Sequence, residues 1–392
     1  MNKSIDLNNL DKSSWQSFTF EQIAEKISKT VQPSEAGVDV YVGLEHIDAN
    51  DIHIRRKGIP SAVKGGKLRC SPGDVIFGKR RAYQRKVAIV DFEGICSAHA
   101  FVFRAIREVI EPKLFPFFLH SDQFMHRMID ISVGGLSPTI NWGDLKHQEF
   151  LLPPKEQQAE IAELLWAMDE VIQRNIKSSA NLYSLYITKI ERELLRKTAK
   201  KRVLGELGSI VRGVGYKPQD LLDEYGTDCC ILLRSNNISR SKVNFKDINI
   251  LPNNKVKKEQ FLIKDDFAIC MSNGSKELVG KAAKFTPDSK NVAVGSFCAV
   301  MRPNSMISTD LLEHLFASKS YRFAIKRALS GSAINNLKPS DIEGLSLRLN
   351  ENMQEVKQTL ISLGGLLEAS KYTDQGVYAS KSLQKSLINQ VF

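Results

Sequence analysis

The order of predicted elements repeats along this chain, and that repeat constrains the fold more than any other feature. Residues 113–195 can be laid over residues 310–392 without a gap, although few residues are identical. Each copy predicts an amphipathic helix that ends at a glycine, then a short alternating strand and a long helix. The helix and the strand are expected at 114–131 and 147–152 in one copy, and at 311–329 and 344–349 in the other.

The upstream halves of the two copies also match, with small shifts, through short apolar stretches typical of strands. The aligned stretches are 20–23 with 204–207, 42–47 with 232–238, 74–77 with 266–269, and 100–104 with 298–302. The sequence therefore predicts an α+β fold of two mixed, β-rich domains in tandem pseudo-repeat, each followed by a long α-helix. The expected boundaries are 1–154, 155–202, 203–350 and 351–392.

The segment 155–198 predicts one long helix, because it follows Pro153-Pro154 and its apolar residues recur at three-and-four spacing. Acidic residues begin it and basic residues end it, as the helix dipole favours. The side chains expected on its spacer or partner face are Ile161, Leu165, Trp166, Met168, Ile172, Leu182 and Leu185.

A second long helix is expected over 353–390, with Leu360, Leu363 and Leu367 on the corresponding face. Gly364-Gly365 and Gly376 predict a kink or break in it. Two such helices can pair antiparallel as a coiled-coil spacer. Ordinary amphipathic core helices are the alternative.

The distribution of charge favours a polyanionic partner. The chain has 55 Lys and Arg against 44 Asp and Glu, a net charge of +11. The segment 55–86 is densely basic and holds a single acid, Asp74. Nucleic acid is the commonest partner of such a block, and a solvated basic face without a ligand is the alternative.

The sequence lacks the features of several classes of protein, namely membrane, secreted, metal-binding and catalytic proteins. No apolar run approaches the roughly 20 residues of a membrane helix, and the polar N-terminus is not a signal peptide, so a cytoplasmic protein is expected. The cysteines lack metal-site spacing, Cys96 and His99 forming only a lone C-x-x-H, so buried free thiols and no metal are expected. Phosphate-loop, dinucleotide, hydrolase and adenine-methyltransferase motifs are also missing, which argues against catalysis by this chain.

The stretch FLLPPKEQQAEIAELLWAMD at 150–169 is similar to the strand, Pro-Pro, Glu-Gln and helix signature of type I restriction–modification specificity (S) subunits. The second copy departs from it, since 349–354 lacks Pro-Pro and keeps only the Gln. The resemblance implies a non-catalytic subunit of a DNA methylation and phage-defence complex, in which each domain reads half of a bipartite, asymmetric site on double-stranded DNA. It further implies that the helices set the spacer and dock two modification (methyltransferase) subunits, and that restriction (motor-nuclease) subunits join. The chain would bind no cofactor, S-adenosylmethionine, ATP and Mg belonging to those partners.

Basic and amide side chains in loops are the candidate DNA contacts, because Arg and Lys bind phosphate or guanine and Asn and Gln bind adenine. In the first domain they are Lys64, Lys67, Arg69, Lys79, Arg80, Arg81, Tyr83, Gln84, Arg85 and Lys86. In the second they are Arg212, Tyr216, Lys217, Ser272, Asn273, Gly274, Lys276 and Lys281.

Three alternatives remain open from the residues. The glycine turns Gly134-Gly135 and Gly331-Ser332 are expected as helix C-caps, although they could instead let backbone approach phosphate. A coiled-coil adaptor that binds RNA or protein, or a self-contained DNA methyltransferase or nuclease, is the competing function. Salt-sensitive binding without sequence preference would favour the adaptor, and cofactor binding by the chain alone would favour the enzyme.

Overall fold

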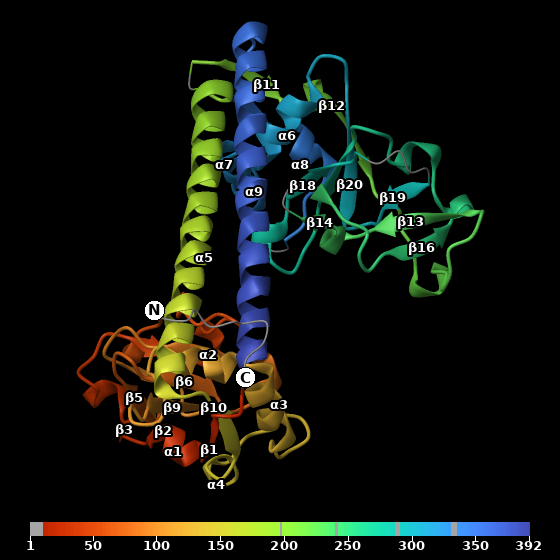
Figure 1. Ribbon diagram of the computed structural model, residues 1–392. Helices are drawn as coiled ribbons and strands as arrows, with labels where there is room; N and C mark the ends of the chain where they lie inside the picture. The colour runs from red at the N-terminus through yellow and green to blue at the C-terminus, as the bar shows by residue number, and fades with distance from the viewer. Residues whose placement is uncertain (1–10, 197, 240–241, 287–290, 331–334) are drawn as a thin grey trace. The chain divides into compact units, whose positions relative to one another are not determined.

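The computed structural model describes residues 11–196, 198–239, 242–286, 291–330 and 335–392 (Figure 1). The chain forms two compact units. The first unit consists of Met1–Lys177 and Thr373–Phe392, and the second unit of Ser178–Tyr372. Each long helix therefore contributes one part of its length to each unit. The division into four segments stays a prediction.

The first unit is built on two four-stranded sheets and a two-stranded ribbon. The sheet orders are β2-β9-β6-β7 and β3-β5-β8-β4, and β1 pairs with β10. The strands are β1 (Gln16–Thr19), β2 (Ala24–Ile27), β3 (Thr30–Val31), β4 (Tyr41–Val42), β5 (Lys67–Cys70), β6 (Val75–Gly78), β7 (Val87–Ile89), β8 (Gly94–Cys96), β9 (Ala100–Ala105) and β10 (Glu149–Leu152). The helices are α1 (Phe20–Ile23), α2 (Phe115–His120), α3 (Asp122–Asp130), α4 (Trp142–Leu145) and the start of α5 (Lys155–Lys189).

The second unit is built on a six-stranded sheet, a three-stranded sheet and a ribbon. The sheet orders are β12-β20-β17-β18-β15-β14 and β16-β13-β19, and β11 pairs with β21. The strands are β11 (Lys200–Val203), β12 (Gly208–Arg212), β13 (Cys229–Leu233), β14 (Ile238–Ser239), β15 (Lys242–Val243), β16 (Asn249–Pro252), β17 (Phe267–Cys270), β18 (Ala282–Lys284), β19 (Val292–Val294), β20 (Cys298–Pro303) and β21 (Ser346–Leu349). The helices are α6 (Thr309–Ala317), α7 (Lys319–Leu329), α8 (Pro339–Glu343), the end of α5 and the first half of α9 (Met353–Val391).

Each helix predicted to end at a glycine is two helices in the structure, so the single-helix predictions were wrong. The break falls at Ser121 between α2 and α3, and at Ser318 between α6 and α7. Each serine adopts extended backbone, and its hydroxyl accepts a hydrogen bond from the backbone N–H three residues later. A serine in this role starts a new helix. Gly134 is not the cap of α3, whose C-cap is Ile131; Gly331-Ser332 lies outside the described residues.

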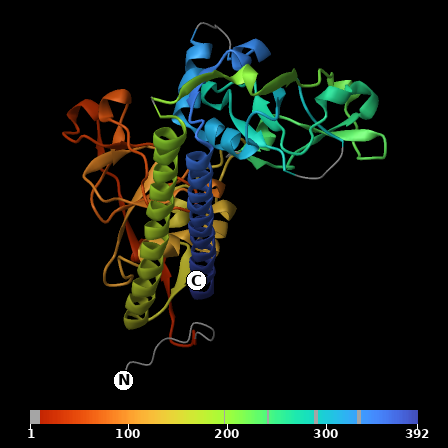
Figure 2. The same ribbon diagram turned by 90° about the horizontal axis from the view of Figure 1, so that it is seen from above.

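The helix α9 runs unbroken through all three of its glycines, so the predicted kink was wrong. A side chain at Gly364 or Gly365 would meet open space, whereas one at Gly376 would lie 3.4 Å from the Asn175 amide. Within the first unit, the Gln384 amide of α9 donates to the Leu165 carbonyl of α5 (3.0 Å). The two segments lie side by side in both views (Figures 1 and 2). Tertiary packing of this kind overrides low helix propensity.

In the second unit α5 and α9 also pack together. The Thr359 hydroxyl donates to the Glu193 carboxylate (3.1 Å), and Ser179 and Ser370 share a hydroxyl hydrogen bond (3.4 Å). The partner positions rise along one helix as they fall along the other, so the segments are antiparallel. After Lys189 the first helix widens into a π-turn over Ile190–Leu194.

The end of α9 completes the apolar core of the first unit. Leu387, Ile388, Val391 and Phe392 belong to the same buried cluster as the phenylalanines of α2 and β9. The Phe392 ring lies 5.1 Å from that of Phe118, edge to face. All six cysteines are buried and free, as predicted. In the described part of the chain, no helix is long and apolar enough to cross a membrane.

Candidate nucleic-acid interface

The loop after β6, residues 79–86, is held in a strained conformation. Arg81 and Arg85 both lie in the left-handed region, with φ of 57° and 51°, on either side of a single 3-10 turn at Ala82–Gln84. Non-glycine residues rarely occupy this region, and strain of this kind clusters at functional sites. Tyr83 at the centre of the turn is 53% exposed. The loop therefore holds the exposed Tyr83 in a defined backbone conformation.

A second loop, residues 131–141 after α3, docks on the first. Val133 and Thr139 exchange backbone hydrogen bonds of 3.0 and 2.9 Å, which close the base of this loop. The Arg81 N–H donates to the Pro138 carbonyl (2.7 Å), and the Ile140 N–H to the Lys79 carbonyl (3.0 Å). The Arg81 guanidinium also donates to the Ser137 hydroxyl (3.0 Å). We call residues 79–86 and 131–141 together the two-loop surface.

An aromatic platform beside the two-loop surface carries two lysines, Lys26 from β2 and Lys79 from the loop after β6. The ammonium of Lys79 lies 5.2 Å from the centre of the Phe101 ring, and that of Lys26 lies 6.0 Å from it. Lys26 also lies 5.5 Å over Trp142. Partial burial, and then the like charge of Lys26, lower the pKa of Lys79. Lys26 was missed from sequence, because only the pairing of β2 with β9 brings it here.

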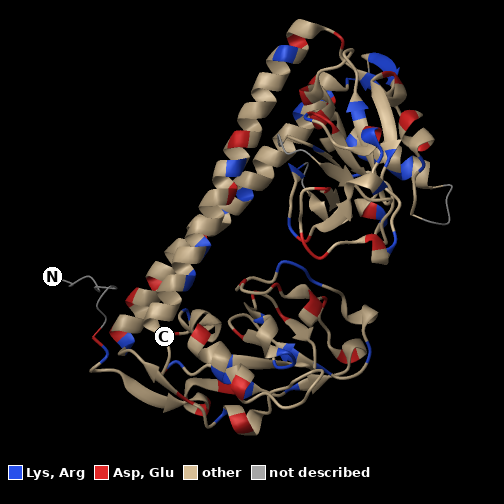
Figure 3. Cartoon of the chain, turned by 90° about the vertical axis from the view of Figure 1, so that its right-hand side faces the viewer, with Lys and Arg blue, Asp and Glu red and all other residues tan. Residues whose placement is uncertain are grey.

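Acids from other segments neutralise part of the basic block 55–86. Arg55 pairs with Asp51, Arg56 with Asp48, and Lys57 with Asp91. Figure 3 shows Lys and Arg interspersed with Asp and Glu across the first unit. The net charge of the block therefore overstates the free positive surface, which is smaller and lies at the two-loop surface.

Four other predicted contacts in this unit have internal roles. The Arg85 guanidinium binds Asn50 (2.8 Å), the His120 carbonyl (2.6 Å) and the Asp122 carboxylate (2.8 Å). The ammoniums of Lys67 and Lys86 and the guanidinium of Arg69 donate to backbone carbonyls. Arg80 and Arg81 are exposed, and Gln84 is half-buried beside them. Among the predicted loop cations, these two arginines and Lys79 are best placed to meet a ligand.

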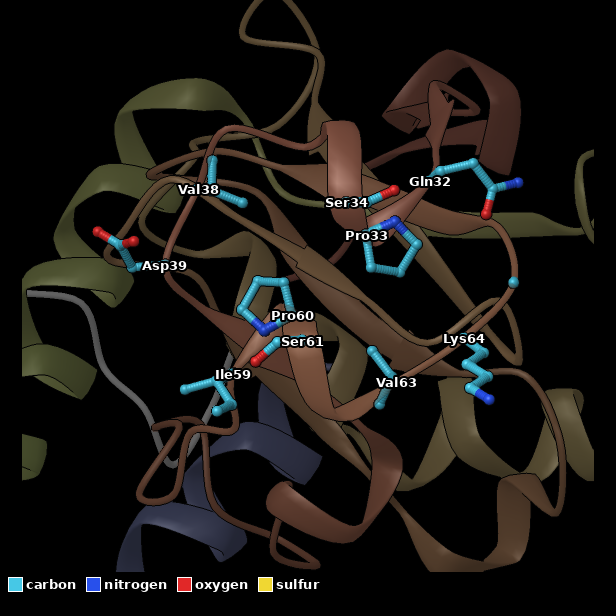
Figure 4. A pocket seen from close by; sticks show the side chains of 11 residues that line it. Gln32, Pro33, Ser34, Val38, Asp39, Ile59, Pro60, Ser61, Val63 and Lys64 are labelled. Atoms are coloured by element: carbon cyan, nitrogen blue, oxygen red, sulfur yellow. The ribbon is translucent and has the colours of Figure 1, made fainter.

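Lys64 lies elsewhere in the first unit, at a separate hollow of about 740 Å³ (Figure 4). Two short 3-10 turns, Pro33–Glu35 and Pro60–Ala62, line it with Val38 and Val63. It shares no lining residue with the two-loop surface. The structure therefore does not bring Lys64 together with the loop cations.

The second unit contains the same loop-on-loop arrangement. Ser272 forms a β-bridge with Asn336, as Arg80 does with Thr139. The Leu337 N–H donates to the Met271 carbonyl (2.8 Å), and the Asn273 N–H to the Asn335 carbonyl (3.3 Å). The predicted contacts Gly274 and Lys276 are exposed on this loop. The Asn273 amide is engaged by Ser235 (3.2 Å), which orients it within the unit.

The remaining predicted contacts of the second unit are dispersed. Arg212 and Lys217 are exposed at and after the end of β12, and Tyr216 is half-buried, its hydroxyl accepting from Asn249 (3.2 Å). Lys281 is half-buried, and its charge lowers the pKa of the Cys270 thiol, which burial raises overall. Within the described residues, no hydrogen bond or ion pair joins these four side chains to Asn273.

The predicted helix-face residues divide between core and surface. Ile161, Leu165, Ile172 and Leu363 are buried, and Met168 and Leu360 pack against the cores. The Trp166 indole donates to the Lys113 carbonyl (2.9 Å). Leu182 is half-buried, whereas Leu185 is 54% and Leu367 36% exposed. The exposed residues remain available to a partner.

The comparisons with known proteins relate this mixed, β-rich domain to a DNA-specificity domain. The family model described as the type I restriction modification DNA specificity domain matches residues 12–182. The match covers less than half of the chain and lies mostly in the first unit, which is therefore similar to that domain.

Curated relatives also match part of the chain. The type I restriction enzyme EcoKI specificity subunit of Escherichia coli K12 is 34% identical over 140 residues, and the StySPI specificity subunit of Salmonella potsdam is 34% identical over 139. Each match covers 36% of this chain and 30% of the relative. The chain thus matches about a third of the length of these relatives.

Solved structures extend the likeness to the whole chain at the level of fold. A chain described in work on complex assembly and conformational transition of the type I R-M system has a TM-score of 0.60, with 17% identity and 97% of both chains covered. The type-I restriction-modification S subunit from M. genitalium has a TM-score of 0.53, with 14% identity and 98% of both chains covered. These likenesses show a shared fold.

Proposed function

We propose that this chain is the DNA-sequence-reading subunit of a type I restriction–modification complex. The observation that carries the proposal is the two-loop surface, which exposes Arg80 and Arg81 beside Lys79 and Lys26. Both loops lie within the residues that match the DNA specificity domain. Arginine and lysine neutralise phosphate and bind guanine, so such a surface suits duplex DNA.

The second unit is proposed to read the other half of a bipartite site. Its loops dock in the same way as those of the first unit, and the strand order β12-β20-β17-β18 parallels β2-β9-β6-β7. These likenesses support a tandem pseudo-repeat. The loops differ in chemistry, with Ser272 and Asn273 where the first unit has Arg80 and Arg81, so the two half-sites are expected to differ in sequence.

The helices α5 and α9 are proposed to act as an antiparallel coiled-coil spacer that sets the separation of the half-sites. Their exposed apolar residues, including Leu185 and Leu367, are proposed to dock two modification subunits, which restriction subunits then join. The chain itself is proposed to be non-catalytic and to bind no cofactor. S-adenosylmethionine, ATP and Mg would act in the partner subunits.

The test is a genome-wide map of methylated bases in cells that express the chain with its modification subunit, with the chain omitted as control. A bipartite motif that appears only with the chain supports the proposal. Absence of methylation, with the modification subunit folded and bound to the chain, contradicts it and favours the adaptor alternative.

Two arginine pairs allow a matched comparison within this test. Arg80→Gln with Arg81→Gln is expected to weaken binding at least tenfold or to relax one half-site only, since both guanidiniums lie on the two-loop surface. Arg55→Gln with Arg56→Gln removes the same charge from ion pairs already formed with Asp51 and Asp48, so it is expected to leave the motif unchanged. Equal effects of the two double variants would contradict the loop assignment.

The spacer proposal is tested by adding one helical turn after Ser179 together with one before Ser370. The paired insertion keeps the two helices in register, because these serines face each other within the second unit. The methylated motif is expected to keep both half-sites and to lengthen its spacer. An active variant with an unchanged spacer would show that the helices do not set the separation of the half-sites.

A further inference from the structure

The tip of the second loop, residues 134–138, carries the most exposed large apolar side chain among the described residues. Leu136 is 95% exposed. Isolated surface leucines are common and need no function. This one, however, belongs to none of the three buried clusters of the first unit, and it is followed by Ser137, which the Arg81 guanidinium binds (3.0 and 3.2 Å).

The loop holds this leucine at a defined position. The hydrogen bonds between Val133 and Thr139 close its base, and those of Arg81 and Lys79 to Pro138 and Ile140 fix it on the neighbouring loop. Gly134, at φ 113°, makes the turn that a side chain would disfavour. Leu136 is thus exposed on a loop tip whose backbone is held in place. A side chain held in this way can press against a bound ligand without being displaced.

The charges around the tip specify the kind of ligand. Lys79, Arg80 and Arg81 lie on the partner loop, so an anionic surface would be drawn over Leu136. An apolar side chain among cations suits duplex DNA, in which phosphates flank an apolar base stack. Proteins use Leu, Ile, Phe, Met and Pro as wedges between base steps, and the unstacking bends the duplex.

We propose that Leu136 inserts between two base pairs of the half-site read by the first unit, while Arg80 and Arg81 hold the flanking phosphates. This inference rests on the proposed function. It adds a distortion of the DNA and a step-dependent component of specificity, because flexible pyrimidine–purine steps unstack most readily.

The experiment uses the full chain in complex with its modification subunit and a duplex carrying the mapped motif. 2-Aminopurine replaces adenine at successive positions of the first half-site, and its fluorescence rises when a base is unstacked. The wild-type complex is expected to raise the fluorescence at one step apart from the methylated adenine, which the modification subunit would itself unstack. Leu136→Ala is expected to abolish that rise and to weaken binding about tenfold, whereas Leu136→Met is expected to retain both.

Folding does not complicate the test, because Leu136 is almost fully exposed. Leu222→Ala in the second unit, where the leucine is 42% exposed, is the matched control and is expected to change neither signal. Specific binding with no fluorescence change at any step other than the methylated adenine would overturn the wedge and leave the proposed function intact. Loss of affinity in Leu136→Ala that thymine-to-uracil replacement reproduces would also overturn it, in favour of a methyl contact. Absence of sequence-specific binding by every form would instead contradict the proposed function.

Discussion

The Arg104 guanidinium of β9 donates two parallel hydrogen bonds to the Asp74 carboxylate, Nε to Oδ1 at 2.8 Å and Nη2 to Oδ2 at 3.1 Å. Asp74 is fully buried, and it also accepts from the Ser71 N–H. The second unit repeats the arrangement, with Arg302 on Asp266 at 3.1 and 2.7 Å and the Ile263 N–H as the additional donor. A bidentate pair of this kind fixes the strand that leads into each candidate DNA-binding loop.

Asp74→Asn is expected to destabilise the first unit by about 2 kcal/mol, because it breaks a pair whose carboxylate is buried while the guanidinium stays half exposed. The free energy of unfolding is measured by urea titration, with hydrogen exchange to assign the loss to β6 and β9. Asp91→Asn, which removes an exposed partner of Lys57, is the control. Equal stability of the Asp74 and Asp91 variants would contradict the assigned role.

Acidification is expected to destabilise both units between pH 6.5 and about 4. Burial lowers the pKa of His120 to about 4, the charge of Arg85 acts in the same direction, and Asp51 opposes it. Burial also lowers the pKa of His314 to about 4. An unfolded histidine titrates near 6.5, so in this window the unfolded chain binds a proton that the folded chain does not.

For each histidine the loss reaches about 3 kcal/mol near pH 4 and vanishes above pH 6.5. Urea unfolding at pH 7.5, 6 and 5 measures it. His120→Gln and His314→Gln are each expected to flatten the pH dependence of one unit. If the slope between pH 6 and 5 matches that of the unmodified chain, the histidines are not its source.

The thiols are expected to resist alkylation in the folded chain. All six are buried, and burial raises the pKa of Cys230 to about 11 and that of Cys298 to about 12. The thiolate is the reactive form, so iodoacetamide at pH 8 finds almost none. Mass spectrometry is expected to show no label on native protein and six after denaturation. Rapid labelling of Cys229 or Cys230 under native conditions would contradict the burial of β13.

Gly365→Ala is expected to stabilise the second unit by about 0.5–1 kcal/mol, because alanine favours a helix and its methyl group would meet open space. Gly376→Ala is the matched comparison, since its methyl group would meet the Asn175 amide at 3.4 Å and gain less. Chemical denaturation measures both. A loss of stability in Gly365→Ala would show that the glycine is needed where α9 was expected to bend.

Sequence patterns predicted the strands that lead into the candidate loops, because short continuous apolar stretches are typical of fully buried strands. They also predicted both long helices. They did not reveal the breaks at Ser121 and Ser318, where a hydroxyl cap outweighs continuous apolar spacing. Nor did they identify Lys26 or the anchoring of the 131–141 loop, because strand pairing and loop docking join residues distant in sequence. For the same reason, the sequence did not predict that Arg85 binds Asn50 and Asp122 and so has an internal role.

The packing of Phe392 against Phe118 sets an order of events during synthesis. Domains ordinarily fold as they leave the ribosome, N-terminal first. Here the apolar core begun by the first 177 residues stays open until residues 387–392 have been made, after the whole of the second unit. Folding of the first unit can therefore begin early but is completed late. Until residues 387–392 have been synthesised, the phenylalanines that they cover stay exposed in the nascent chain.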